Sequence, residues 1–252
     1  MREREDAYGR MLHDALEDED VEEIVERDDG FVMASRFGPA AYLAPYRRWP
    51  SRQRRAMRLV RGRVLDVGCG AGRVALHLQE RGREVVSIDP SPGAIEACRR
   101  RGVHDARVLS LEDVDASLGV FDTIVMLGNN LGLLGSEAKA RRLLRRLHRL
   151  TSDRGRIVGE TLAARETDDP AHLRYHERNR ARGRLPGQIR IRVRYRDLAT
   201  PWFDYLFVSP DELRKLVEGT GWRIARLLDA EETLYVAVLE KERPLSGRRA
   251  PG

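Results

Sequence analysis

Short apolar runs alternate with amphipathic stretches from residue 62 onward. The pattern predicts strands at 64–67, 84–88, 106–109, 121–127 and 156–159, and helices at 74–81, 92–101 and 137–150. The first two helices are expected to end at Gly82 and Gly102, because glycine commonly follows the last helical residue. Strands that alternate with helices favour parallel βαβ units with right-handed crossovers. The chain is therefore expected to adopt an α/β fold.

The alternation breaks after Glu160, where a polar, arginine-rich segment follows. This segment predicts a helix over about 172–182. Residues 188–197 alternate between apolar and arginine side chains, which indicates a strand, and 202–208 is its expected antiparallel partner. We expect residues 164–208 to form an inserted helix and hairpin that act as a lid or substrate cap. A helix beginning at Ser209-Pro210 and strands at 222–228 and 233–239 complete the domain.

The first 61 residues are expected to form a helical or lid segment. Helices are predicted up to Leu16, over 21–27 and over 51–60, with irregular chain at 31–49. Residues 1–30 contain 13 acidic and 4 basic residues, so this acidic segment is expected to dock on the basic remainder. Residues 62–242 then form the main domain, and 243–252 a flexible tail.

The composition is that of a globular chain, with 41% hydrophobic and 34% charged residues. No apolar run approaches the roughly 18 residues of a membrane helix, and the N-terminus lacks the apolar core of a signal peptide. We therefore expect a cytoplasmic protein with no membrane partner. Cys69 and Cys98 lack zinc-ligand spacing, so no metal site is expected. The net charge of +6 makes a nucleic-acid partner possible, but the one-sided use of arginine favours a compositional bias instead.

A glycine-rich loop follows the first predicted strand of the main domain. The stretch Val64–Arg73 reads VLDVGCGAGR and lies between a strand and a helix, as a nucleotide-binding loop does. Gly68, Gly70 and Gly72 allow a sharp turn and a close backbone approach to a ligand. Asp89 ends the second strand, 21 residues after Gly68, and βαβ geometry places it beside the loop. Its carboxylate can accept both hydroxyls of a ribose, which predicts a nucleoside-containing cofactor.

Two features argue against a dinucleotide at this loop. A dinucleotide fingerprint reads G-x-G-x-x-G, whereas here the glycines run G-x-G-x-G and Arg73 stands at the last fingerprint position. Asp66 lies two residues before the first glycine and would repel a pyrophosphate. A ligand that carries an ammonium and a sulfonium would be attracted instead. Asp66 either contacts that ammonium or braces the loop through backbone amides.

These motifs resemble those of class I S-adenosylmethionine-dependent methyltransferases over about 62–240. Val64–Arg73 is similar to the first motif of that family and Asp89 to the second, while 110–113 falls where the family contacts adenine. The resemblance implies a doubly wound, Rossmann-like, seven-stranded and mostly parallel sheet whose last strand is antiparallel. It also implies S-adenosylmethionine as cofactor. The expected cofactor-binding residues are Asp66, Gly68, Cys69, Gly70, Gly72, Asp89, Pro90, Ser110, Leu111, Glu112, Leu127, Gly128 and Asn129.

Four side chains are candidates for a catalytic role near the acceptor. Glu160 ends the fifth strand, His172 and His176 lie one turn apart on a predicted helix, and Tyr175 lies beside them. A general base is required only if the acceptor must lose a proton. The two histidines are more simply interpreted as solvated, because no third metal ligand accompanies them.

The resemblance implies methyl transfer by in-line displacement, and a lid over a pocket favours a small-molecule acceptor. Three alternatives stay open. The basic charge of the chain after residue 30 is compatible with a methyltransferase that acts on RNA or protein. Salt-sensitive binding to RNA would support this alternative. A non-catalytic cofactor-binding module would show no transfer to any acceptor. A nicotinamide dehydrogenase would be separated by titration with both cofactors.

Overall fold

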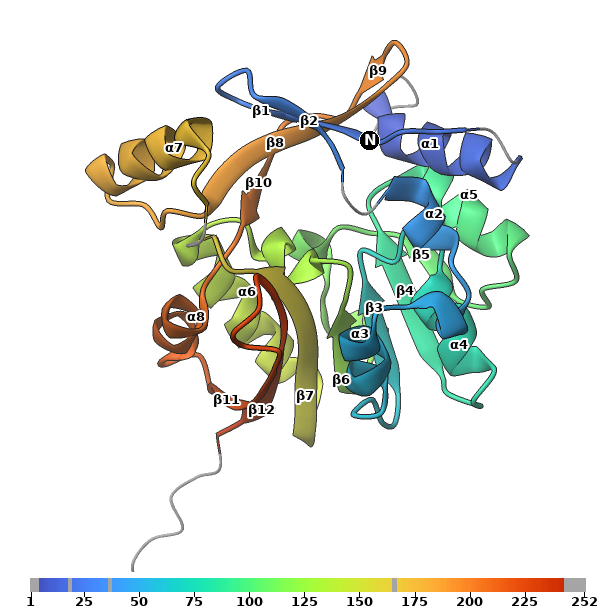
Figure 1. The fold of residues 1–252 in the computed structure, drawn as a ribbon. Coiled ribbons are helices and arrows are strands. Elements are labelled where there is room, and N and C mark those ends of the chain that lie inside the picture. The colour runs from blue at the N-terminus through green and yellow to red at the C-terminus, as the bar shows by residue number, and fades with distance from the viewer. Residues whose placement is uncertain (1–4, 18–19, 36–37, 165–166, 243–252) are drawn as a thin grey trace, which may run out of the picture.

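The computed structural model describes residues 5–17, 20–35, 38–164 and 167–242. Two sheets organise the chain, and the smaller one arches over one end of the larger (Figure 1). The larger sheet has the order β11-β12-β7-β6-β3-β4-β5. Its strands are β3 (Val64–Val67), β4 (Val85–Asp89), β5 (Ala106–Val108), β6 (Phe121–Met126), β7 (Thr151–Leu162), β11 (Trp222–Leu228) and β12 (Leu234–Lys241).

The strand directions match the sequence-based expectation. The strands β3 to β7 pair in parallel, whereas β12 is antiparallel to both of its neighbours, β7 and β11. All residues of β3 and β4 are buried, as expected for parallel strands covered on both faces. The predicted seven-stranded, mostly parallel sheet with an antiparallel last strand is confirmed.

Helices cover both faces of the larger sheet, which makes it doubly wound. On one face lie α3 (Ser51–Met57), α4 (Arg73–Gln79) and α5 (Pro92–Arg100), and on the other lie α6 (Glu137–Arg149) and α8 (Pro210–Val217). The helix α6 buries Leu143, Leu144 and Leu147 and turns its arginines to solvent. The helix α8 begins with a capping box between Ser209 and Glu212.

The smaller sheet brings together two segments that are far apart in the sequence. It contains β1 (Ile24–Arg27), β2 (Val32–Ala34), β8 (Gln188–Tyr195), β9 (Leu198–Ala199) and β10 (Phe203–Leu206). The order is β10-β8-β1-β2 with β9 on β8, and every pair is antiparallel. The helix α7 (Pro170–Ala181) precedes this sheet in the C-terminal segment and lies at its end (Figure 1). The expected hairpin is thus part of a larger sheet.

Three local predictions in the N-terminal segment are wrong. Residues 21–27 do not form a helix, because 24–27 pair with β8 as strand β1. The span 31–49 is not simply irregular, since it contains β2, α2 (Gly38–Leu43) and a 3₁₀ turn at Tyr46–Arg48. The helix α3 ends at Met57 rather than at residue 60. Pairing with a distant strand overrides local helix preference here.

The acidic N-terminal segment docks on the main domain, as expected. The helix α1 (Ala7–Leu16) packs against α5, and its residues Ala7, Met11 and Leu12 are fully buried. The Asp6 carboxylate caps α1 through Gly9 N and accepts a bond of 2.7 Å from Ser91 Oγ. The role of 164–208 as a lid stays a prediction, and the expected tail at 243–252 lies outside the described residues.

Candidate active site

A cavity of about 830 Å³ lies between the carboxyl ends of the parallel strands and the smaller sheet. This volume is toward the upper end of the usual range for small-molecule pockets, which is about 300–1,000 Å³. One half of the lining comes from the glycine loop, Asp89, the 110–112 turn and the loop after β6. The other half comes from the smaller sheet and α7. The cavity therefore extends without interruption from the predicted cofactor residues to the space beneath the smaller sheet.

The glycine loop has the backbone conformation that its sequence predicts. Gly68, Gly70 and Gly72 all have positive φ angles, of 67°, 53° and 76°. A Cβ on Gly70 would stand 2.7 Å from the Tyr8 hydroxyl oxygen, so that position has no room for a side chain. Gly72 does not line the cavity, because it faces Val103 and Cys98 behind the loop. Two glycines thus shape the cavity wall and the third permits close packing.

Asp89 holds the loop to the end of β4. Its two carboxylate oxygens accept bonds from Gly70 N at 3.1 Å and from Ser91 N at 3.0 Å. Burial raises the pKa of Asp89 to about 6, although these two bonds lower it in part. The same carboxylate lines the cavity, so it is both a brace for the loop and a group available to a ligand.

Asp66 lines the cavity and carries an unsatisfied carboxylate oxygen. The side chain is 2% exposed, and its Oδ2 atom has no hydrogen-bond partner among the described residues. Burial raises the pKa of Asp66 to about 7, and the Arg73 guanidinium opposes that shift. A buried acceptor without a donor is costly, so a cationic donor on a ligand would be stabilised here.

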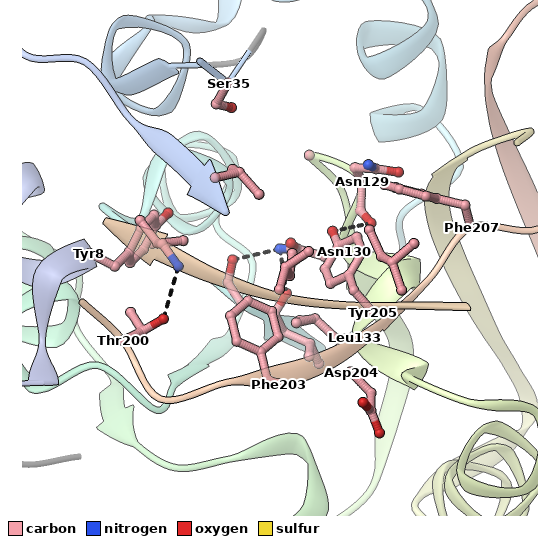
Figure 2. A pocket seen from close by; sticks show the side chains of 18 of the residues that line it. Tyr8, Ser35, Asn129, Asn130, Leu133, Thr200, Phe203, Asp204, Tyr205 and Phe207 are labelled. Carbon is pink, nitrogen blue, oxygen red and sulfur yellow. Dashed lines mark hydrogen bonds between the residues drawn. The ribbon is translucent and has the colours of Figure 1, made fainter. Parts of the chain in front are cut away.

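The loop after β6 is tied to two neighbouring segments by hydrogen bonds. Asn130 Nδ2 donates to Gly68 O at 2.7 Å, which ties this loop to the glycine loop. The Tyr205 hydroxyl donates to Asn129 O at 2.6 Å, as Figure 2 shows. Asn129 has a φ angle of 71°, and its buried Oδ1 has no partner among the described residues. Leu127, Gly128 and Asn129 all line the cavity, and their contact with a cofactor stays a prediction.

Glu160 supports that loop from behind and does not line the cavity. Its Oε1 accepts from Arg52 Nε at 2.6 Å, and its Oε2 accepts from Gln53 Nε2 at 2.6 Å and Gly128 N at 2.8 Å. The side chain is fully buried, and both oxygens are engaged. This geometry favours a positioning role for Glu160 over the role of a general base.

The three candidates on α7 have different surroundings. His172 and His176 line the cavity, and His172 Nδ1 lies 2.9 Å from Arg27 Nη1. Burial lowers the pKa of His176, so its imidazole is predominantly neutral at pH 7. Tyr175 does not line the cavity, and its hydroxyl donates to Asp28 Oδ1 at 2.7 Å. Tyr175 therefore secures α7 to the turn after β1.

The remaining predicted cofactor residues border the same half of the cavity. Cys69, Pro90, Ser110, Leu111 and Glu112 all contribute to its lining. Glu112 forms ion pairs with Lys139 and, at 3.7 Å, with Arg142, so its carboxylate is already engaged. Ser110 Oγ accepts from Glu112 N at 3.2 Å and caps the turn. Within the described residues, no cluster of histidine, cysteine and carboxylate side chains is suited to a metal ion.

Several cavity residues escape prediction from the sequence. Arg73 lines the cavity beside Asp66 and stacks on the Trp49 ring, with its Cζ atom 4.7 Å from the ring centre. The only sequence feature that could have indicated Arg73 as a site residue is its position directly after the third glycine of the loop. Tyr8, Glu23 and Tyr42 come from the N-terminal segment, and no local pattern marks them as site residues.

Comparison with known proteins agrees with this geometry. Residues 19–227 match the family described as "Methyltransferase domain". A SAM-dependent methyltransferase from Bacteroides fragilis, solved in complex with S-adenosyl-L-homocysteine, superposes with a TM-score of 0.80 at 25% identity, covering 96% of this chain and 98% of that one. The chain therefore belongs to the methyltransferase domain family, as the motifs predicted.

Two curated relatives share shorter stretches. A ubiquinone biosynthesis O-methyltransferase of Methylocella silvestris is 38% identical over 80 residues, which is 29% of this chain and 31% of that protein. A malonyl-[acyl-carrier protein] O-methyltransferase of Salmonella typhimurium is 33% identical over 100 residues, 36% of this chain and 39% of that protein. The matches thus span 31% and 39% of the lengths of these two relatives. None of the described helices is both long and apolar enough to cross a membrane.

Proposed function

We propose that this protein transfers the methyl group of S-adenosylmethionine to a small, largely apolar acceptor. The observation that carries the proposal is one continuous cavity of about 830 Å³. It joins the glycine loop, Asp66 and Asp89 to a second compartment under the smaller sheet. Two reactants bound in one enclosed space fit a transfer reaction better than simple cofactor storage does.

The residues present fit S-adenosylmethionine in charge and in shape. Asp89 would accept the ribose hydroxyls, and the 110–112 turn would border the adenine. The unpaired Asp66 Oδ2 would accept from the methionyl ammonium. Arg73, which lies nearby, would attract the methionyl carboxylate. The bound cofactor supplies an electrophilic methyl group on a sulfonium.

The second compartment supports a small apolar acceptor. Its walls from the smaller sheet include Val25, Met33, Ile189, Ile191, Val193 and Phe203. An apolar wall of this kind can keep water away from the reacting groups. The smaller sheet, by covering the strand ends, would hold the acceptor in line with the methyl group (Figure 1). Alignment of the two reactants and exclusion of water are what in-line displacement requires of the protein.

Isothermal titration with S-adenosylhomocysteine tests the cofactor half of the proposal. Wild-type protein should bind with measurable heat, and Asp89→Ala should weaken binding tenfold or more, since charge-assisted hydrogen bonds contribute about 1.5–3 kcal/mol each. Asp105→Ala is the matched control, because Asp105 lies on the surface in an ion pair with Arg107. Absence of heat with folded wild-type protein would refute the proposal.

The acceptor class has its own test. Retention on RNA at low salt would favour a nucleic-acid substrate, whereas a small-molecule enzyme should pass through an RNA column without salt dependence. A cytoplasmic location is expected for this protein and is testable by fractionation of its native host.

A further inference from the structure

A buried carboxylate lies in the acceptor half of the cavity, in a place that neither the motifs nor the candidate bases include. Glu23 directly precedes β1, is 5% exposed and lines the cavity. Its Oε2 accepts from the Tyr42 hydroxyl at 2.8 Å, and its carboxylate is also bonded by the Ser35 side chain. Ser35 N donates to Glu23 O at 2.8 Å, which fixes the backbone at this point. Figure 2 shows Ser35 across the cavity from Phe203 and Tyr205.

This carboxylate lies close to the predicted cofactor loop. The Tyr42 ring packs edge-on against the Tyr8 ring, with 5.9 Å between centroids. The Tyr8 hydroxyl in turn lies against Gly70, 2.7 Å from the position of a Cβ there. Burial raises the pKa of the Tyr205 hydroxyl, which donates to Asn129 O, and the nearby Glu23 charge adds to that rise. Glu23 therefore stands where the acceptor compartment meets the cofactor half.

Glu23 has no positive partner among the described residues. The cationic side chains that line the cavity are engaged elsewhere or lie on the cofactor side. Arg27 pairs with Asp29, Lys139 pairs with Glu112, and Arg73 stacks on Trp49. The polar groups that bond Glu23 are neutral hydroxyls. An ionised carboxylate in an apolar wall is costly unless a cation neutralises it.

We propose that Glu23 is the acceptor-binding carboxylate and that the acceptor is an amine carried on an apolar body. The inference rests on the proposed methyl transfer. An ammonium would replace the missing positive partner, and the apolar lining would hold the rest of the molecule. Anionic acceptors would be repelled by the same group. The site is therefore built for N-methylation of a small apolar amine.

The chemistry also gives Glu23 a role in proton transfer. An ammonium has no free lone pair, so it must first lose one proton, and the Glu23 carboxylate can accept that proton. The nitrogen lone pair then forms a bond to the methyl carbon while the carbon–sulfur bond breaks and its electron pair stays on sulfur. The product is a methylated ammonium and a neutral thioether. Glu23 returns its proton to solvent when the product leaves. Burial raises the pKa of Glu23, which makes its carboxylate a stronger base than an ordinary glutamate.

Binding of 2-phenylethylamine to the protein saturated with S-adenosylhomocysteine tests this inference. The amine should bind at least tenfold more tightly than 2-phenylethanol or phenylacetate, which have the same apolar body without the positive charge. Glu23→Gln should weaken amine binding tenfold or more and leave S-adenosylhomocysteine affinity within twofold. Glu26→Gln is the matched control, because Glu26 pairs with Arg192 outside the cavity.

The possible results distinguish failure of the amine assignment from failure of the proposed methyl transfer. Equal binding of the alcohol, tighter binding of phenylacetate, or no binding of the amine would overturn the assignment of an amine acceptor. Loss of S-adenosylhomocysteine affinity in a folded Glu23→Gln variant would show that Glu23 belongs to the cofactor half. That result would also overturn the assignment of an amine acceptor. Absence of S-adenosylhomocysteine binding by the wild type would instead refute the proposed function itself.

Discussion

Burial of carboxylates is the main physical feature of this site at the scale of single residues. Asp66, Asp89 and Glu23 all line the same cavity, and burial raises the pKa of each. A protein bears such a cost where a ligand later supplies compensating donors or charge. Asp66 shows this most directly, because its free Oδ2 atom has no donor within the described chain.

The affinity for S-adenosylhomocysteine should depend on pH through Asp66. The pKa of this carboxylate is about 7, and a ligand ammonium pairs only with the ionised form. Affinity should therefore fall about tenfold between pH 8 and pH 6, measured by titration calorimetry. Asp66→Asn should bind more weakly and show a flatter profile. An unchanged affinity across this range in the wild type would contradict the assignment.

The stability of the ligand-free protein should change in the opposite direction. The folded state keeps a proton on Asp66 and Asp89 at pH values where the unfolded chain has already released it. The contribution of these groups to the free energy of unfolding therefore decreases as pH rises from about 4 to about 7. Urea denaturation at several pH values measures this effect. The free energy of unfolding should fall less steeply with rising pH in Asp66→Asn than in the wild type. Parallel profiles for the two proteins would contradict it.

At the scale of elements, α1 and α5 meet through two glycines. A Cβ on Gly93 would lie 2.8 Å from Gly9 Cα and 3.1 Å from Asp6 Oδ2, so the two helices approach with no side chain between them. The same junction holds Asp6, which accepts from Gly93 N at 2.8 Å. This contact fixes Tyr8, and with it the wall next to Gly70.

Gly93→Ala should separate these helices. The added methyl must displace backbone rather than a flexible side chain, and overpacking of this kind costs about 1–3 kcal/mol. Urea or thermal denaturation measures the loss. Glu96→Ala, at an exposed position of the same helix, should change the free energy of unfolding by only about 0.5 kcal/mol. Equal effects of the two substitutions would show that the helices can adjust freely.

At the scale of the whole molecule, the N-terminal segment completes both the smaller sheet and the cavity. The strand β1 lies between β2 and β8, and the helix α1 buries its apolar face on α5. Removal of residues 1–30 would leave β8 without its partner on one side and expose Ile191 and Val193.

The truncated protein lacking residues 1–30 should therefore be strongly destabilised. A loss of several kcal/mol corresponds to a drop in Tm of about 10 °C or more for a chain of this size. Thermal denaturation followed by circular dichroism measures the change. A melting temperature equal to that of the full chain would show that the docked segment contributes no stability.

The larger sheet can be predicted from the amino-acid sequence alone, and so can the glycine loop and Asp89, which line one half of the cavity. Gly68, Gly70 and Asp89 are set by local requirements, namely a tight turn after a buried strand and an acidic residue at the end of the next one. These requirements appear at fixed spacing along the chain, so they can be read without knowledge of the fold.

The half of the cavity under the smaller sheet depends on contacts between distant segments, which no local pattern in the sequence reveals. Glu23 and Tyr42 reach the cavity because β1 pairs with β8, for example through Val25 and Val193, which are 168 positions apart in the sequence. The same pairing turned a predicted helix into a strand, since strand formation here depends on a partner and not on local preference. The position of Glu160 behind the cavity also depends on a long-range contact. Arg52 and Gln53, from a helix distant in the sequence, donate hydrogen bonds to its carboxylate. Local backbone conformation restricts which residues can stand at neighbouring positions, so it can be predicted from the sequence. Contacts between distant segments form only in the folded chain, so no local sequence pattern predicts them.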